Sequence, residues 1–176
     1  NEKTCQISNY NEQQLEAETL EADTQNYQIP LLIGKVRETW AYGKEAKRLV
    51  SVKDGFAVGR LLSRSLAGEK IQFGEESYDA VWLLAKYIQM SLQSFGQIDG
   101  IVFSVPKLTE EIAQLLRGIA VRMNINKNQI FVQDYKESFC NNLFYQPNEL
   151  WQYDAALFNC SRNEVHAYML RRLKPN

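Results

Sequence analysis

The order of apolar runs and helical patterns between residues 98 and 170 constrains this chain more than any other feature. Apolar runs predict buried strands at residues 100–105, 129–134 and 154–159, with a helical pattern between successive runs. Strands joined through a helix run parallel, so the sequence predicts three parallel strands, followed by an alternating strand at residues 165–170. In open sheets of this kind, ligands bind at the carboxyl ends of the strands. Those ends are Pro106, Asp134 and Asn159.

Sequence patterns in the first half of the chain predict antiparallel strands and short helices. Alternation and β-branched or aromatic residues indicate strands at residues 4–10, 27–36, 39–42 and 70–73. Helices are expected at residues 44–50 and 54–67, and Gly68 is expected to end the second. Ser77 is expected to be the N-cap of the long helix that follows.

Two long helices carry apolar residues at helical spacing, and we expect these stripes to form the core. The first stripe contains Val81, Leu84, Ala85, Ile88, Leu92 and Phe95. The second contains Leu108, Ile112, Leu115, Leu116, Ile119 and Met123.

Composition excludes several classes of function. The net charge of −1 shows no basic excess for nucleic acid, and no apolar run is long enough to span a membrane. The three cysteines, Cys5, Cys140 and Cys160, lack metal-ligand spacing, and we expect reduced thiols in a cytoplasmic protein. His166 is the single histidine, which excludes a His-rich metal site. A nucleophilic pair of Cys160 and His166 is disfavoured because His166 lies in an alternating strand.

The element order and several local patterns resemble the actin and heat-shock-chaperone ATPase superfamily, including an uncharacterised bacterial branch of actin-like ATPases. Residues 29–33 and 40–46 resemble a Pro-bearing strand followed by a Gly-x-x-Ala turn into a helix. Residues 99–106 resemble the family strand that ends in Val-Pro, and Gln133-Asp134 stands where the family has an acidic or amide residue.

The resemblance implies an α/β, ribonuclease-H-like lobe of actin type, with a mixed sheet whose parallel strands are joined by helices. It implies one domain over residues 1–176, corresponding to the N-terminal half of such an ATPase. The core lobe would cover residues 1–50 and 77–171, with a small accessory insertion at residues 50–77. We therefore expect the chain to be a piece of a longer protein.

The resemblance also implies a nucleotide site. Lys3 and Thr4 would remain from the first phosphate loop, and Asn159, Ser161 and Arg162 would lie in the hairpin where the second begins. Asp134 is the candidate catalytic residue, positioned to order a lytic or magnesium-bound water. The alternative role for Asp134 is to cap a helix at residues 135–144. No residue is assigned as a direct metal ligand.

Departures from the family pattern weaken the case for catalysis. Neither phosphate-loop segment in this chain contains glycine, whose missing Cβ lets backbone N–H groups approach phosphate. Asn159 replaces an aspartate and cannot supply the negative charge that holds hydrated Mg²⁺. Gly59 and Arg60 stand where chaperones carry a catalytic lysine. Arg60 or Arg162 could contact phosphate, but solvated surface arginines are the favoured alternative.

Two functions follow, and whether the chain is an enzyme stays open. The first is a nucleotide-dependent switch or assembly protein, in which the missing C-terminal half of the same chain closes on ATP and Mg²⁺. This piece alone would bind neither tightly. The second is a non-catalytic pseudo-ATPase that serves as an interaction or scaffold module, through self-association or a protein partner. A small-molecule kinase is disfavoured, because we find neither a catalytic carboxylate nor a substrate loop for it.

Overall fold

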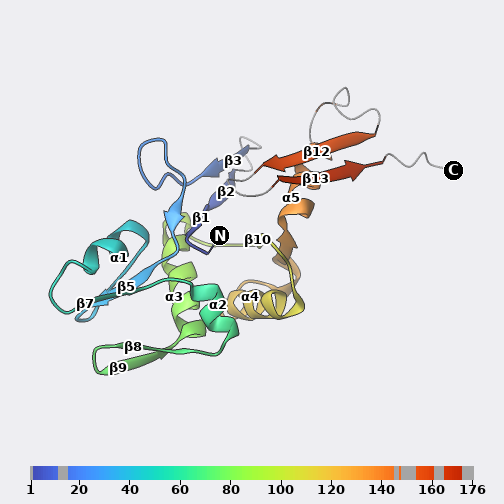
Figure 1. Ribbon diagram of the computed structural model, residues 1–176. Coiled ribbons are helices and arrows are strands. Elements are labelled where there is room, and N and C mark those ends of the chain that lie inside the picture. Colours follow the sequence, from blue (N-terminus) through green and yellow to red (C-terminus); the bar gives the residue numbers. More distant parts are fainter. Residues whose placement is uncertain (1, 12–15, 145–146, 148–153, 161–164, 172–176) are drawn as a thin grey trace. The chain divides into compact units, whose positions relative to one another are not determined.

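The computed structural model describes residues 2–11, 16–144, 147, 154–160 and 165–171 (Figure 1). It is a mixed α/β protein in which helices alternate with several small sheets. The chain divides into two compact units. The first comprises Asn1–Ile101 and Thr109–Phe131, and the second comprises Val102–Leu108 and Val132–Asn176.

Short antiparallel strands begin the first unit. Strand β1 (Thr4–Cys5) pairs with β4 (Ile29–Pro30), and β2 (Ser8–Asn11) pairs with β3 (Glu16–Thr19). The prediction of one strand over residues 4–10 is therefore wrong, because the chain changes partner at Gln6 and Ile7.

The predicted strand at residues 27–36 is also divided, into β4 and β5 (Ile33–Val36). Between them, the Leu31 amide donates to the Lys3 carbonyl at 2.9 Å, and the Leu32 carbonyl accepts from the Gly43 amide at 2.9 Å. These backbone groups are used by two different neighbours, so one continuous ladder cannot form.

A three-stranded antiparallel sheet is the centre of the first unit. Its order is β6-β5-β7, with β6 at Thr39–Tyr42 and β7 at Gly55–Val58. Helix α1 (Gly43–Leu49) follows β6 and confirms the helix predicted at residues 44–50.

The helix predicted at residues 54–67 is wrong in its first half. Residues 55–58 pair with β5 as β7, and only Leu61–Leu66 is helical, as α2. Gly55 permits this path, because a Cβ there would lie 2.0 Å from the Leu49 carbonyl oxygen. The accessory insertion at residues 50–77 stays a prediction, although its first strand pairs directly with β5.

A hairpin of β8 (Lys70–Phe73) and β9 (Glu76–Asp79) leads into α3 (Ala80–Leu92) and the short 3₁₀ helix η1 (Gln93–Phe95). The strand predicted at residues 70–73 is confirmed. The prediction that Ser77 caps the helix is wrong, because Ser77 pairs with Gln72 in the hairpin. Asp79 occupies the cap position without a side-chain hydrogen bond.

Helix α3 supplies much of the core, but on a face rotated from the predicted one. The side chains buried on it are Leu83, Leu84, Tyr87 and Ile88, together with Ala80 and Ser91. Only Leu84 and Ile88 belong to the predicted stripe. Helix α3 contacts α2 as well as β5, β6 and β9, so burial on it follows several neighbours and not one apolar stripe.

The strand–helix–strand–helix pattern after residue 98 is confirmed. Strand β10 (Ile101–Val105) and β11 (Ile130–Asp134) form a two-stranded sheet, joined through α4 (Glu110–Arg122) and the 3₁₀ helix η2 (Lys127–Gln129). Helix α4 buries Ala113, Leu116, Ile119 and Ala120, so only Leu116 and Ile119 of the predicted stripe are buried.

The predicted third strand of the parallel set is present, and its described partner is the strand that follows it. Strand β11 leads into α5 (Tyr135–Phe144), and β12 (Ala155–Cys160) pairs antiparallel with β13 (Val165–Leu170). Among the strand pairings described, β12 has no bond to β10 or β11. The antiparallel hairpin uses one edge of β12, and parallel pairing of its other edge with β11 stays a prediction.

None of the helices in the described part of the chain is both long and apolar enough to cross a bilayer; α3 and α4, at 13 residues each, fall short of a spanning length.

Leu83→Ala tests the core of the first unit. The Leu83 side chain is fully buried, so its truncation should lower the free energy of unfolding by about 2–5 kcal/mol in urea denaturation. Val50→Ala is the matched control, because Val50 is 64% exposed and should change stability by less than about 0.5 kcal/mol. A loss below about 1 kcal/mol for Leu83→Ala would contradict this core.

Candidate functional site

At the carboxyl ends of β10 and β11, the neutral side chains of Ser104 and Gln133 contact the hydroxyl of Ser138. Ser138, in the first turns of α5, lies with its Oγ 2.6 Å from the Ser104 Oγ and 2.8 Å from the Gln133 Nε2. The same Oγ donates to the Asp134 carbonyl at 3.2 Å. A serine hydroxyl has one donor and two acceptor sites, so these contacts use all of them. Ser138 therefore ties both strand ends to α5 and is not free for a ligand.

Asp134 caps α5 in a reciprocal arrangement with Glu137. The Glu137 amide donates to the Asp134 Oδ1 at 3.0 Å, and the Asp134 amide donates to the Glu137 Oε2 at 3.2 Å. This is a capping box, in which two amides without helical partners are satisfied by each other's side chains. The cap role predicted as the alternative for Asp134 is confirmed. Its catalytic role stays a prediction.

The predicted nucleotide-binding residues lie in different units or outside the described residues. Lys3 and Thr4 belong to the first unit, where the Thr4 Oγ1 donates to the Gln28 Oε1 at 2.7 Å. Asn159 lies in β12 of the second unit, in register with His166. Ser161 and Arg162 lie outside the described residues. A joint nucleotide site of these five residues stays a prediction.

Arg60 also has a local role. It precedes α2 as its N-cap residue, with a left-handed backbone at φ 55°, and its side chain is exposed. The segment compared with the lysine-bearing helix of chaperones, residues 56–62, is instead most of β7, a short connection and the start of α2.

The described strand ends offer a single carboxylate, that of Asp134, to the magnesium and phosphate site that the resemblance implies. Ser104, Gln133 and Ser138 are neutral and bonded to one another, and the Asp134 carboxylate already accepts a backbone amide. In the described part of the chain, no group of three or more acidic, cysteine or histidine side chains could hold a metal ion.

Cys5 has the environment of a structural thiol. Its Sγ lies 3.1 Å from the Tyr87 hydroxyl, which donates to the Pro30 carbonyl at 3.2 Å. Burial raises the pKa of the Cys5 thiol above its ordinary value, so the reactive thiolate is disfavoured. Cys5 and Cys140 are both free thiols, in agreement with the expectation of reduced cysteines.

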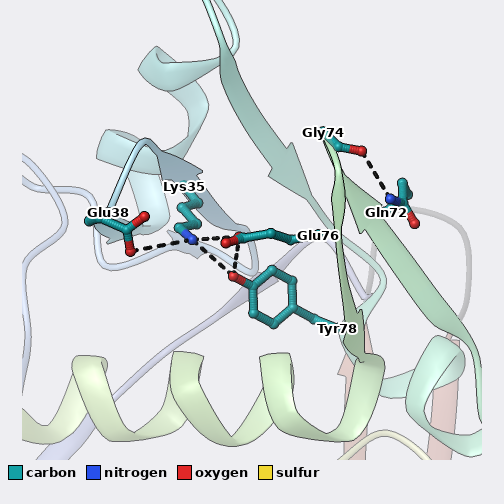
Figure 2. A network of polar contacts seen from close by, with 6 residues as sticks. All are labelled: Lys35, Glu38, Gln72, Gly74, Glu76 and Tyr78. Carbon is teal, nitrogen blue, oxygen red and sulfur yellow. Dashed lines mark hydrogen bonds and ion pairs between the residues drawn. The ribbon is translucent and has the colours of Figure 1, made fainter.

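An ion pair of the first unit, centred on the buried Lys35 and the half-exposed Glu76, was not predicted from the sequence (Figure 2). Lys35 lies in the central strand β5, with Trp40 and Phe56 as its cross-strand neighbours, and is only 6% exposed. Its Nζ lies 2.6 Å from the Glu76 Oε2, donates to the Tyr78 hydroxyl at 2.9 Å, and lies 3.7 Å from the Glu38 Oε2.

Aromatic rings complete the enclosure of this ammonium group. The Lys35 Nζ lies 5.6 Å from the Trp40 ring centroid and 5.5 Å from that of Tyr78, within the range of cation–π attraction. Residues two apart on a strand share a face, so Lys35 lies on the same face as the buried Ile33. A charged residue at this inward position was the sequence signal for the ion pair.

The Lys35–Glu76 pair shifts both pKa values. The hydrogen bonds from Lys35 and Tyr78 lower the pKa of Glu76. The hydrogen bonds to Glu76 and Tyr78 raise the pKa of Lys35, although burial opposes that rise. Both groups are therefore held in their charged forms at neutral pH.

Variants at Asp134 distinguish a cap from a catalytic carboxylate. Asp134→Ala should cost about 1 kcal/mol of α5 stability, whereas Asp134→Asn should retain most of it, because asparagine caps as well as aspartate. Hydrogen exchange at the Glu137 amide is the measurement. Equal protection in both variants would contradict the cap.

Glu76→Gln tests the ion pair through pH. The folded-state pKa of Glu76 lies below its ordinary value of 4.5, so its stabilising contribution is present above that value and is lost as pH falls through the folded pKa. The stability difference between the native chain and Glu76→Gln should therefore shrink between pH 7 and pH 3, measured as urea midpoints. Glu75→Gln, an exposed neighbour, is the control and should show little difference at any pH; a Glu76→Gln difference that grows on acidification would contradict the sign.

Comparison with known proteins adds one family. No curated protein matches the chain significantly. A family described as "family of unknown function (DUF5716) C-terminal" matches residues 14–175, nearly the whole chain. The chain therefore belongs to the DUF5716 C-terminal family.

Proposed function

We propose that this chain is a non-hydrolysing module of actin and heat-shock-chaperone ATPase type, which acts by binding other proteins. The observation that carries the proposal is the capping box of Asp134 and Glu137. The one carboxylate at the described strand ends that could order a lytic water is engaged in holding the start of α5.

The fold part of this proposal is a ribonuclease-H-like lobe. The order β10–α4–β11–α5, followed by the β12–β13 hairpin, supports it, as does the antiparallel strand set that precedes α3. Parallel pairing of β12 with β11 would complete the expected sheet, and it remains part of the proposal.

The interaction part rests on what the strand ends contain. A hydrolytic site needs fixed charges or hydrogen-bond donors aimed at the charge that develops in the transition state, or a metal held by free carboxylates. Ser104, Gln133 and Ser138 offer neutral groups that satisfy one another. The free thiols of Cys5 and Cys140 support the cytoplasmic location that belongs to the same proposal.

Calorimetric titration with Mg·ATP tests the proposal. It should be run on this chain and on the longer protein that we expect to contain it, each shown to be folded by circular dichroism. We expect no heat of binding at millimolar nucleotide and no phosphate release, with Asp134→Ala indistinguishable from the native chain.

A nucleotide-dependent switch is the competing outcome. A micromolar dissociation constant that is lost in Asp134→Ala, while Asp134→Asn keeps the cap but also loses binding, would place Asp134 in a nucleotide cleft. That result would overturn the proposal.

A further inference from the structure

Five aromatic side chains of the first unit form a continuous cluster, which we call the aromatic cluster. Its members are Trp40, Phe56, Phe73, Tyr78 and Trp82. They come from β6, β7, β8, β9 and α3, so segments far apart in the sequence meet here. The cluster is exposed at two ends, where Trp82 is 44% and Phe56 is 40% exposed.

The ring geometry leaves an outward surface on Trp82. Its indole stacks on Tyr78 with ring centroids 5.2 Å apart and an interplanar angle of 23°. Trp40 meets the same indole in a tilted contact at 5.3 Å. These neighbours fix the indole orientation, yet nearly half of the side chain stays accessible. A large apolar ring that is held rigid and left exposed is a feature of protein-binding surfaces.

Within the Lys35 ion-pair network beside the cluster, the carboxylates outnumber the ammonium group. The single positive charge of Lys35 faces two carboxylates, Glu76 and Glu38 (Figure 2). These three groups therefore carry a net charge of about −1 at neutral pH. Glu76 is fixed by the Lys35 and Tyr78 contacts, whereas the Glu38 side chain is 91% exposed and lies 3.7 Å from the Lys35 Nζ. Glu38 is thus the carboxylate available to a second cation.

Two other cations lie close in sequence and compete with a ligand. Arg37 precedes Glu38 in the turn between β5 and β6, and Lys86 lies one helical turn after Trp82 in α3. Among the contacts described, neither stacks on a ring of the cluster, whereas Lys35 contacts two of its rings.

We propose that the aromatic cluster binds an arginine-bearing segment of a partner protein, with a guanidinium stacked on Trp82 and Glu38 attracting the segment's positive charge. A planar guanidinium stacks on an indole face better than an ammonium does. The exposed platform suits a protein segment, because small ligands require a concave site that encloses them. This inference rests on the proposed interaction function and names the chemistry of the partner.

The test follows the Trp82 indole N–H signal by NMR during titration with the peptide acetyl-Gly-Arg-Gly-Arg-Gly-amide. The same peptide with citrulline in place of arginine is the control ligand, since it keeps the shape and loses the charge. We expect saturable shifts with the arginine peptide, which weaken as salt is added, and none with the citrulline peptide.

Variants locate the binding and have matched controls. Trp82→Leu and Glu38→Gln should each weaken binding by about threefold or more. In Trp82→Leu the peptide is followed by its own signals. Tyr10→Leu, at an exposed aromatic residue of β2, and Glu21→Gln, at an exposed carboxylate, should leave the affinity unchanged. Glu38→Gln keeps the test decisive even if Trp82→Leu fails to fold, because Glu38 is almost fully exposed.

Equal binding of the two peptides, unchanged affinity in Glu38→Gln, or no shift at millimolar peptide would overturn the inference. A different measurement, the titration with Mg·ATP, tests the proposed non-hydrolysing function. Binding of Mg·ATP would overturn that proposal whatever the peptide does.

Discussion

The burial of the Lys35 charge is the constraint on which the first unit depends. An ammonium removed from water is strongly unfavourable unless it is paired and hydrogen-bonded. The partners of Lys35 come from outside its sheet, because Glu76 and Tyr78 lie in the β8–β9 hairpin. The hairpin must therefore pack against β5, and its Phe73 and Tyr78 rings then meet Trp40 of β6 and Trp82 of α3. One ion pair thus fixes the relation of sheet, hairpin and helix, and it orders the aromatic cluster that we propose as a binding surface.

In the second unit, residues that were expected to take part in catalysis make hydrogen bonds that hold secondary structure together. An aspartate at the end of a strand, followed by a helix, is equally suited to a reactive site and to a cap. Here Glu137 lies three residues after Asp134, and the two side chains satisfy each other's amides. Ser138 is likewise saturated by Ser104, Gln133 and the Asp134 carbonyl. Side chains that are engaged with one another at a strand end are suited to holding elements together, which is the basis for proposing interaction in place of hydrolysis.

Sequence patterns predicted the helices and strands that are determined by their own residues. They missed the elements that are determined by contacts with distant parts of the chain. Helix α5 and strands β6, β8 and β13 have the predicted bounds, because alternation, turn residues and capping residues suffice for them. Residues 55–58 carry a helix-compatible pattern, but pairing with β5 and the close approach of Gly55 to Leu49 make them a strand. The buried face of α3 is rotated about the helix axis from the predicted face, because α2 also packs against this helix. The Lys35 ion pair could have been suspected from a charge at an inward strand position, but its partner Glu76, 41 residues away, could not be identified by spacing.

The backbone amide of Glu137 reports most directly on the central claim. Its hydrogen bond to Asp134 marks the carboxylate as a cap, and nuclear magnetic resonance can follow its signal as Mg²⁺ and ATP are added. If Asp134 is a structural cap in a non-hydrolysing module, the signal and its slow exchange should persist unchanged at millimolar nucleotide. A saturable shift at micromolar Mg·ATP, with faster exchange of that amide, would show the carboxylate leaving the cap for a ligand and would contradict the account.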